Sequence, residues 1–96
     1  MTREGIDTER LKERERRQER KRKFLVRLGV HIGKIRRSKG YSMDRLALEA
    51  DLSRATMSRI EKGSVDPQAF TLESIARTLG IKFSHLVDFD IRLRLK

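Results

Sequence analysis

The chain has no cysteine, only one proline and no long apolar run among its 96 residues. The absence of cysteine excludes disulfides, thiolate metal sites and thiol nucleophiles, and nothing indicates an oxidising compartment, so a cytoplasmic protein is the simplest expectation. No apolar stretch approaches the ~18 residues of a membrane span, and the N-terminus lacks the apolar segment of a secretory signal. We therefore expect a soluble, unprocessed protein that has no membrane partner.

The residues needed for catalysis or metal binding are also missing. A chain of 96 residues forms one domain at most, which leaves little room for a large catalytic cleft. The acidic residues form no carboxylate pair beside a nucleophile, so we expect no enzymatic activity, no cofactor and no small-molecule ligand. His31 and His85 have no second ligand at a metal-binding spacing, so we expect no metal and assign both to surface or capping roles.

Positive charge is what the chain has in excess. Its 24 Lys and Arg residues outnumber 14 Asp and Glu residues, and the formal net charge is +10. Such an excess favours a polyanionic partner, either nucleic acid or an anionic membrane surface, and charge alone does not choose between them.

Residues 1–23 form a charged N-terminal extension with too few apolar side chains to build a core of their own. Acid-before-base pairs at a spacing of four, Glu13 with Arg17 and Glu19 with Lys23, favour a helix. We predict an exposed helix over residues 8–23 that frays or extends the next one. The segment is either a solvated or disordered tail or an arm that contacts phosphates. A membrane-surface or RNA-binding arm is a weaker alternative, because an apolar face and aromatic residues are missing.

Residues 24–89 have the pattern of a packed all-α domain of five helices. The first is indicated by an apolar stripe at spacings of 3, 4 and 3, namely Leu25, Leu28, Ile32 and Ile35, and it ends at Gly40. The second runs over 43–50 with Ser42 as N-cap and Leu46, Leu48 and Ala50 as its apolar content, and the third runs over 53–62 and is closed by Gly63. The fourth runs from Gln68 or Ala69 to Leu79 with Phe70, Leu72, Ile75, Ala76 and Leu79 inward, and a short fifth begins near Ser84 and carries Leu86, Val87 and Phe89.

The last residues, 90–96, change to a period of two. Ile91, Leu93 and Leu95 alternate with basic residues, which is typical of a half-buried strand. A lone strand in a helical domain would pair with the same strand of a second copy, so this segment predicts a short dimerisation strand. A frayed basic tail is the alternative.

The two short helices over 43–62, joined by a tight turn at Asp51, have the arrangement of a helix-turn-helix. From about Leu28 to Phe89 the sequence resembles the lambda-repressor and Cro family, also called the XRE family of bacterial and phage regulators. The segments that carry the resemblance are I-R-R-S-K-G at 35–40, L-A-L-E-A-D-L-S at 46–53, M-S-R-I-E-K-G at 57–63, Pro67, and I-A-R-T-L-G-I at 75–81.

The resemblance implies a small core that sets the angle between the two helices, made by Leu46, Ala47, Leu52, Met57 and Ile60. It also implies a partly buried salt bridge between Arg36 and Glu61. Two positions depart from the family pattern. Asp51 replaces the usual turn glycine and should adopt left-handed geometry at some cost. Met43 replaces a frequent glutamine that bridges a phosphate to the recognition helix.

The third helix is the expected reading element in the DNA major groove. The residues predicted to contact base edges are Ser53, Arg54, Ala55, Thr56, Ser58 and Arg59. Arginine suits guanine because its planar fork reaches O6 and N7 together, while the Ala55 and Thr56 methyl groups suit thymine. The positions predicted around the phosphates are Lys39, Ser42, Met43, Arg45, Lys62, Ser64, Gln68 and Thr71.

One such module reads only a few base pairs, so we expect a homodimer on inverted repeats of double-stranded DNA. The predicted dimer contacts are Phe83, Leu86, Val87, Phe89, Ile91, Leu93 and Leu95. The resulting prediction is a transcriptional regulator similar to Cro proteins or to the controller proteins of restriction-modification systems. The stretch from F-L-V to L-S-R-A-T-M-S-R-I-E resembles the controller proteins. The alternative is an antitoxin that binds a toxin partner and regulates its own operon.

Overall fold

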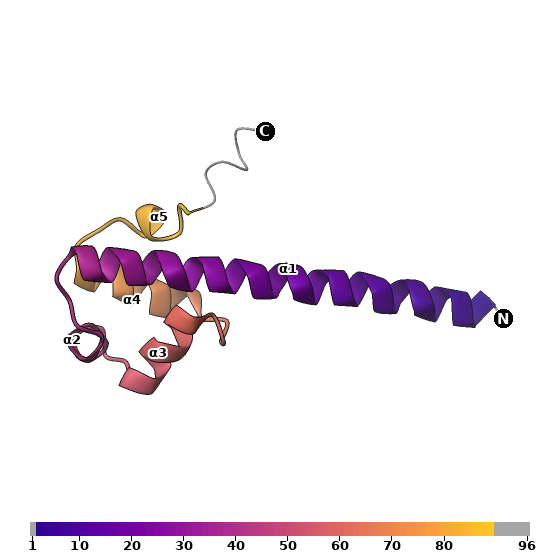
Figure 1. Cartoon of the computed structure of the whole chain (residues 1–96), viewed down its shortest axis with the longest axis horizontal. Helices are drawn as coiled ribbons and strands as arrows, with labels where there is room; N and C mark the ends of the chain where they lie inside the picture. Colours follow the sequence, from indigo (N-terminus) through magenta and orange to yellow (C-terminus); the bar gives the residue numbers. More distant parts are fainter. Residues whose placement is uncertain (1, 90–96) are drawn as a thin grey trace.

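The computed structural model describes residues 2–89, and the side chains of residues 7–89. It is an all-α fold of five helices, α1 (Thr2–Ser38), α2 (Met43–Glu49), α3 (Arg54–Lys62), α4 (Ala69–Leu79) and α5 (Phe83–Leu86) (Figure 1). Within this part of the chain there is no strand, so the prediction of an all-α, five-helix domain is confirmed. The strand predicted in 90–96 lies outside the described residues.

The N-terminal extension and the first domain helix are one continuous helix of 37 residues. Figure 1 shows α1 leaving the domain as a long rod, and the molecule measures 58 × 33 × 18 Å along its principal axes. Of the two forms considered for residues 8–23, the structure has the helix that extends the next one. Ion pairs at i,i+3 and i,i+4 support this exposed segment, for example Glu19 with Arg22 at 2.8 Å.

A single apolar core lies between the C-terminal half of α1 and the other four helices. Its completely buried members are Ile32, Leu46, Met57, Ile75 and Leu86. One predicted core residue, Phe70, is wrong, because it is 75% exposed, and Leu48, which belongs to the apolar content of α2, is 79% exposed. Each is separated by two positions from a buried leucine of its own helix, and two positions turn a helix by about 200°, so both side chains lie on the solvent side.

Serine caps and a left-handed turn set the angle between α2 and α3. The Oγ atoms of Ser42 and Ser53 accept hydrogen bonds from the N–H groups of Arg45 and Thr56, both at 3.0 Å. Asp51, which replaces the usual turn glycine, has the left-handed conformation that the turn requires, with φ of 61°. The next residue, Leu52, donates its N–H to Ala47 O at 2.8 Å. The chain therefore turns from α2 into α3 within four residues.

The C-terminal end of α3 lies directly against the backbone of α1. A Cβ atom added to Gly29 would lie 2.3 Å from Glu61 O, and one added to Gly63 would lie 2.7 Å from Val26 Cα. Only glycine leaves room for this approach, so α3 is held at a fixed distance and angle from α1.

The fifth helix begins at Phe83, one residue before the predicted start, and only Leu86 of the predicted residues lies fully in the core. Phe89 follows the helix and packs on α1, with its ring 5.2 Å from that of Phe24 and 5.7 Å from that of His31. His31 Nε2 lies 3.0 Å from His85 O, so this histidine joins α1 to the end of the chain that is described.

Candidate nucleic-acid interface

The two faces of α3 differ in chemistry and exposure. Met57 and Ile60 are buried in the core, whereas Arg54, Ala55 and Arg59 are exposed on the other side. The serine cap leaves the first turn of α3 projecting from the domain in Figure 1, away from α1. This geometry allows side chains on the first two turns of α3 to reach an external surface without disturbing the core.

The predicted base-contacting residues are not equally available. The hydroxyl of Ser53 both caps α3 and donates to Thr56 Oγ1 at 2.9 Å, so these two polar groups satisfy each other. Thr56 and Ser58 are partly buried, while the two arginines and Ala55 are exposed. The most exposed of these groups are therefore two guanidinium groups and one methyl group.

Arg54 has an ion-pair partner that sequence analysis missed. Its Nε lies 2.6 Å from Asp44 Oδ1 in the first turn of α2, and both side chains are largely exposed. The pair crosses from one helix of the motif to the other, so it depends on the turn at Asp51. In the sequence, Asp44 is already explained as an acidic residue that interacts favourably with the helix dipole at the start of α2. Nothing in the sequence indicates that it also binds Arg54.

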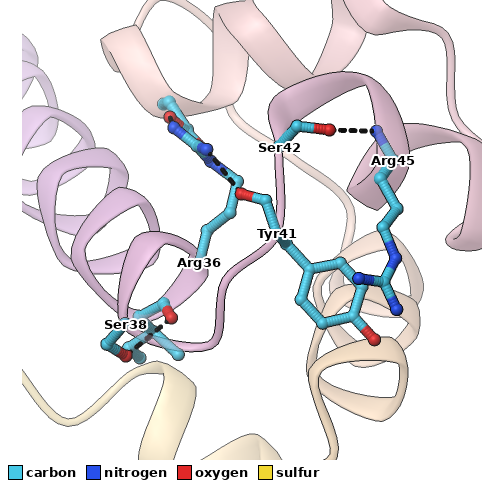
Figure 2. A network of polar contacts seen from close by, with 7 residues as sticks. Arg36, Ser38, Tyr41, Ser42 and Arg45 are labelled. Carbon is cyan, nitrogen blue, oxygen red and sulfur yellow. Dashed lines mark hydrogen bonds and ion pairs between the residues drawn. The ribbon is translucent and has the colours of Figure 1, made fainter.

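The salt bridge implied by the resemblance is present. Arg36 donates to both carboxylate oxygens of Glu61, with Nε to Oε2 at 2.6 Å and Nη2 to Oε1 at 3.1 Å. Its Nη1 also donates to Tyr41 O at 2.9 Å, a contact drawn in Figure 2. Because both side chains are nearly buried and every bond is charge-assisted, the pair ties the end of α1, the following loop and the end of α3 together.

The candidate phosphate contacts near α2 lie around its N-terminus. Ser42 and Lys39 are exposed there, while Met43 is partly buried against the core and cannot donate from its side chain. Figure 2 shows the Arg45 guanidinium over the Tyr41 ring, 4.1 Å from the ring centroid. Arg45 also binds Glu49 at 3.0 Å, and this hydrogen bond, followed by the charge of Glu49, raises the pKa of Arg45.

A second group of candidates meets at the other end of the motif. An open notch of about 220 Å³ lies between α3 and α4, and its lining includes Thr56, Arg59, Gln68 and Thr71. Gln68 is the N-cap of α4 and makes no side-chain capping bond, so its amide is available at a helix N-terminus. Ser64, in contrast, donates its hydroxyl to Arg59 O at 3.2 Å and closes α3. Lys62 is exposed beside it.

The described residues show neither a metal-binding cluster nor a membrane-spanning helix. Within residues 2–89, no group of three or more His, Cys, Asp or Glu side chains could hold a metal ion. None of the helices in this range is long and apolar enough to cross a bilayer. The groups gathered around α2, α3 and the start of α4 are suited to a polyanionic surface.

Comparison with known proteins agrees with this geometry. A helix-turn-helix family profile matches residues 32–86. The chain is 37% identical over 62 residues to the control protein C.BamHI of Bacillus amyloliquefaciens, across 64% of this chain and 76% of that protein. It is 36% identical over 64 residues to the HTH-type transcriptional regulator SlrR of Bacillus subtilis, across 66% of this chain but only 42% of SlrR.

A solved structure has the same arrangement of helices. A variant of the restriction-modification controller protein C.Esp1396I matches with a TM-score of 0.67 and 32% identity, covering 76% of this chain and 97% of that one. The family match covers more than half of the chain and includes α2, the turn, α3 and α4. The chain therefore belongs to the XRE-type helix-turn-helix family of DNA-binding transcription regulators.

Proposed function

We propose that the protein binds double-stranded DNA sequence-specifically, as a homodimer on inverted repeats, with α3 in the major groove. The observation that carries this proposal is the division of α3 into a buried apolar face and an exposed face with Arg54, Ala55 and Arg59. In this role each arginine offers a planar fork to a guanine, and the methyl groups of Ala55 and Thr56 pack on thymine.

Phosphate contacts on both sides of α3 would hold the helix in register. At one side, Lys39, Ser42 and Arg45 surround the N-terminus of α2, and at the other, Gln68 and Thr71 surround the N-terminus of α4. Helix N-termini suit phosphates because their N–H groups are unpaired and the dipole is positive there. Arg45 would exchange Glu49 for a phosphate, which is inexpensive because that pair is exposed.

The proposed dimer surface lies at α5. Phe83 is 41% exposed, and Val87 and Phe89 are partly exposed beside it. Leu86 is completely buried within the protomer, so it supports this surface from below and does not itself reach a second copy. The remaining predicted contacts, Ile91, Leu93 and Leu95, lie outside the described residues.

Selection of binding sites from random duplexes tests the proposal as a whole. We expect enrichment of an inverted repeat with half-sites about one helical turn apart, and a sedimentation mass of two chains on each selected duplex. Enrichment of a single half-site with one chain bound would contradict the dimer. An absence of any enriched sequence would contradict specific reading by α3 and would favour a function that depends on a protein partner, such as an antitoxin.

Arg54→Ala tests the reading role directly. We expect it to weaken binding to the selected site by about 1 to 3 kcal/mol while changing affinity for random duplex little, because a guanine contact acts on one sequence only. Arg77→Ala is the matched control, since it removes the same charge from an exposed ion pair near the end of α4. Equal losses on selected and random DNA for Arg54→Ala would mean that this side chain holds a phosphate.

A further inference from the structure

The N-terminal half of α1 carries positive charge along one side. The buried stripe of this helix advances by three or four residues at a time, through Leu25, Leu28, Ile32 and Ile35. The same spacing continues toward the N-terminus through Lys21, Arg17, Arg14 and Arg10, which we call the cationic row. Since residues at this spacing share one face of a helix, the row lies on the side of α1 that packs on α3 within the domain.

An ion pair shows which part of the domain lies beside the first residue of the cationic row. Lys21 Nζ lies 3.6 Å from Asp66 Oδ2, in the loop that joins α3 to α4. This loop leads directly into Gln68 and Thr71, to which the proposed function assigns phosphate contacts. Figure 1 shows α1 continuing well past the loop, so the rest of the row extends outward from beside the proposed DNA surface.

Two acidic residues of the extension, Glu13 and Glu19, bind cations outside the row. Glu13 pairs with Arg16 at 3.3 Å, and Glu19 pairs with Arg22 at 2.8 Å. The side-chain hydrogen bond from Arg22, and then its charge, lower the pKa of Glu19, as expected for a carboxylate that an arginine engages. Among the side chains that the structure describes, no ion pair engages the three outer arginines of the row.

We infer that the cationic row binds the phosphate backbone of duplex DNA flanking the site read by α3, an inference that rests on the proposed function. Arginines that make no ion pair among the described side chains, repeated along one side of a helix, suit a polymer with regularly repeated negative charge. At 1.5 Å per residue, the segment from Thr2 to Lys21 is about 30 Å long, and the row within it, from Arg10 to Lys21, covers about 17 Å, which is the length of about five base pairs. These contacts read no bases and tolerate any flanking sequence.

The test compares two triple variants of the full chain that remove equal charge from opposite sides of α1. The row variant carries Arg10→Gln, Arg14→Gln and Arg17→Gln. The control variant carries Lys12→Gln, Arg16→Gln and Lys23→Gln, positions on the far side of the helix. The affinity of each variant is measured on the selected site alone and on the same site with about twelve further base pairs at each end. These flanks are longer than the N-terminal segment of α1, which is about 30 Å long. Circular dichroism verifies that both variants keep their helix content.

We expect the row variant to lose affinity only on the longer duplex. There its dependence of log K on log salt should be shallower by about 5, since each lost phosphate contact removes about 0.9 and a dimer loses three contacts from each of its two chains. Its deficit should therefore shrink by about 1,000-fold between 50 and 200 mM salt on the longer duplex. The control variant should change this slope by less than about 1.

Two results would overturn the inference while leaving the proposed function intact. One is an equal loss for both triple variants, which would mean that net charge acts without regard to the side of α1. The other is a row variant that binds the longer duplex as the parent does, while Arg54→Ala still loses the selected site. Failure of the proposed function itself is distinct, because the parent chain would then select no sequence.

Discussion

Replacing Arg36 with methionine should lower the free energy of unfolding by about 3 to 5 kcal/mol, a large part of the stability of a small domain. Arg36 and Glu61 are only 11% and 10% exposed, so the substitution leaves a carboxylate with neither its counter-charge nor full hydration. Tyr41 O loses a donor as well. Chemical denaturation followed by circular dichroism measures this loss.

Two further variants separate the buried charge from the lost arginine. Arg77→Met breaks an ion pair of similar length, but Arg77 is 79% exposed, so we expect a loss below about 1 kcal/mol. Combining Arg36→Met with Glu61→Leu should recover most of the lost stability, because no unpaired charge remains in the core. If Arg36→Met costs no more than Arg77→Met, the buried pair does not fasten α1 to α3.

Gly29→Ala should have the second large effect, although alanine normally favours a helix by about 1 kcal/mol over glycine. The new Cβ would lie 2.3 Å from Glu61 O and 2.5 Å from Ile60 O, and neither backbone atom can rotate away as a side chain could. We expect a net loss of about 2 to 3 kcal/mol as α3 is pushed from α1. Thermal or chemical unfolding measures it, and affinity for the selected site should fall with it because α3 changes its angle.

Gly33→Ala, one turn further along the same helix, is the matched control. Its Cβ would lie 3.2 Å from Glu61 Oε1 and 3.3 Å from Arg37 Nη1, contacts that are longer than those at Gly29 and involve side chains instead of backbone. The Glu61 carboxylate, held by Arg36, need move only a few tenths of an ångström, so the change in stability should stay within about 1 kcal/mol. Equal tolerance of alanine at both positions would mean that the contact between α1 and α3 is looser than the structure indicates.

Helix positions followed from the sequence because periodicity and caps are local signals. Ser42, Ser53 and Gly63 are close to the ends they were assigned, and the stripe that begins at Leu25 is buried as expected. Burial in short helices was harder to predict. Phe70 and Leu48 are apolar residues on the solvent side, and composition cannot distinguish them from core residues when a helix has only two or three turns.

Whether a contact between helices could be predicted depended on the kind of information available. The pair of Arg36 and Glu61 was implied by family resemblance, and no spacing rule would have joined residues 25 positions apart. The pair of Arg54 and Asp44 was missed for the same reason. The side of α1 on which the cationic row lies could have been found from the sequence, by following the apolar stripe beyond Leu25 into the charged segment.

The rigid projection of α1 also bears on how quickly the protein reaches its site. Electrostatic attraction is screened within about 10 Å at 0.1 M salt, so charge on the domain alone acts only close to the duplex. If the cationic row binds DNA as inferred, a rod that carries its cations about 17 Å outward from Lys21 would enlarge the volume in which a passing duplex is attracted and oriented. Because the backbone of the helix is already ordered, each contact would cost only side-chain entropy, and the row would release one set of phosphates and take the next as the protein slides.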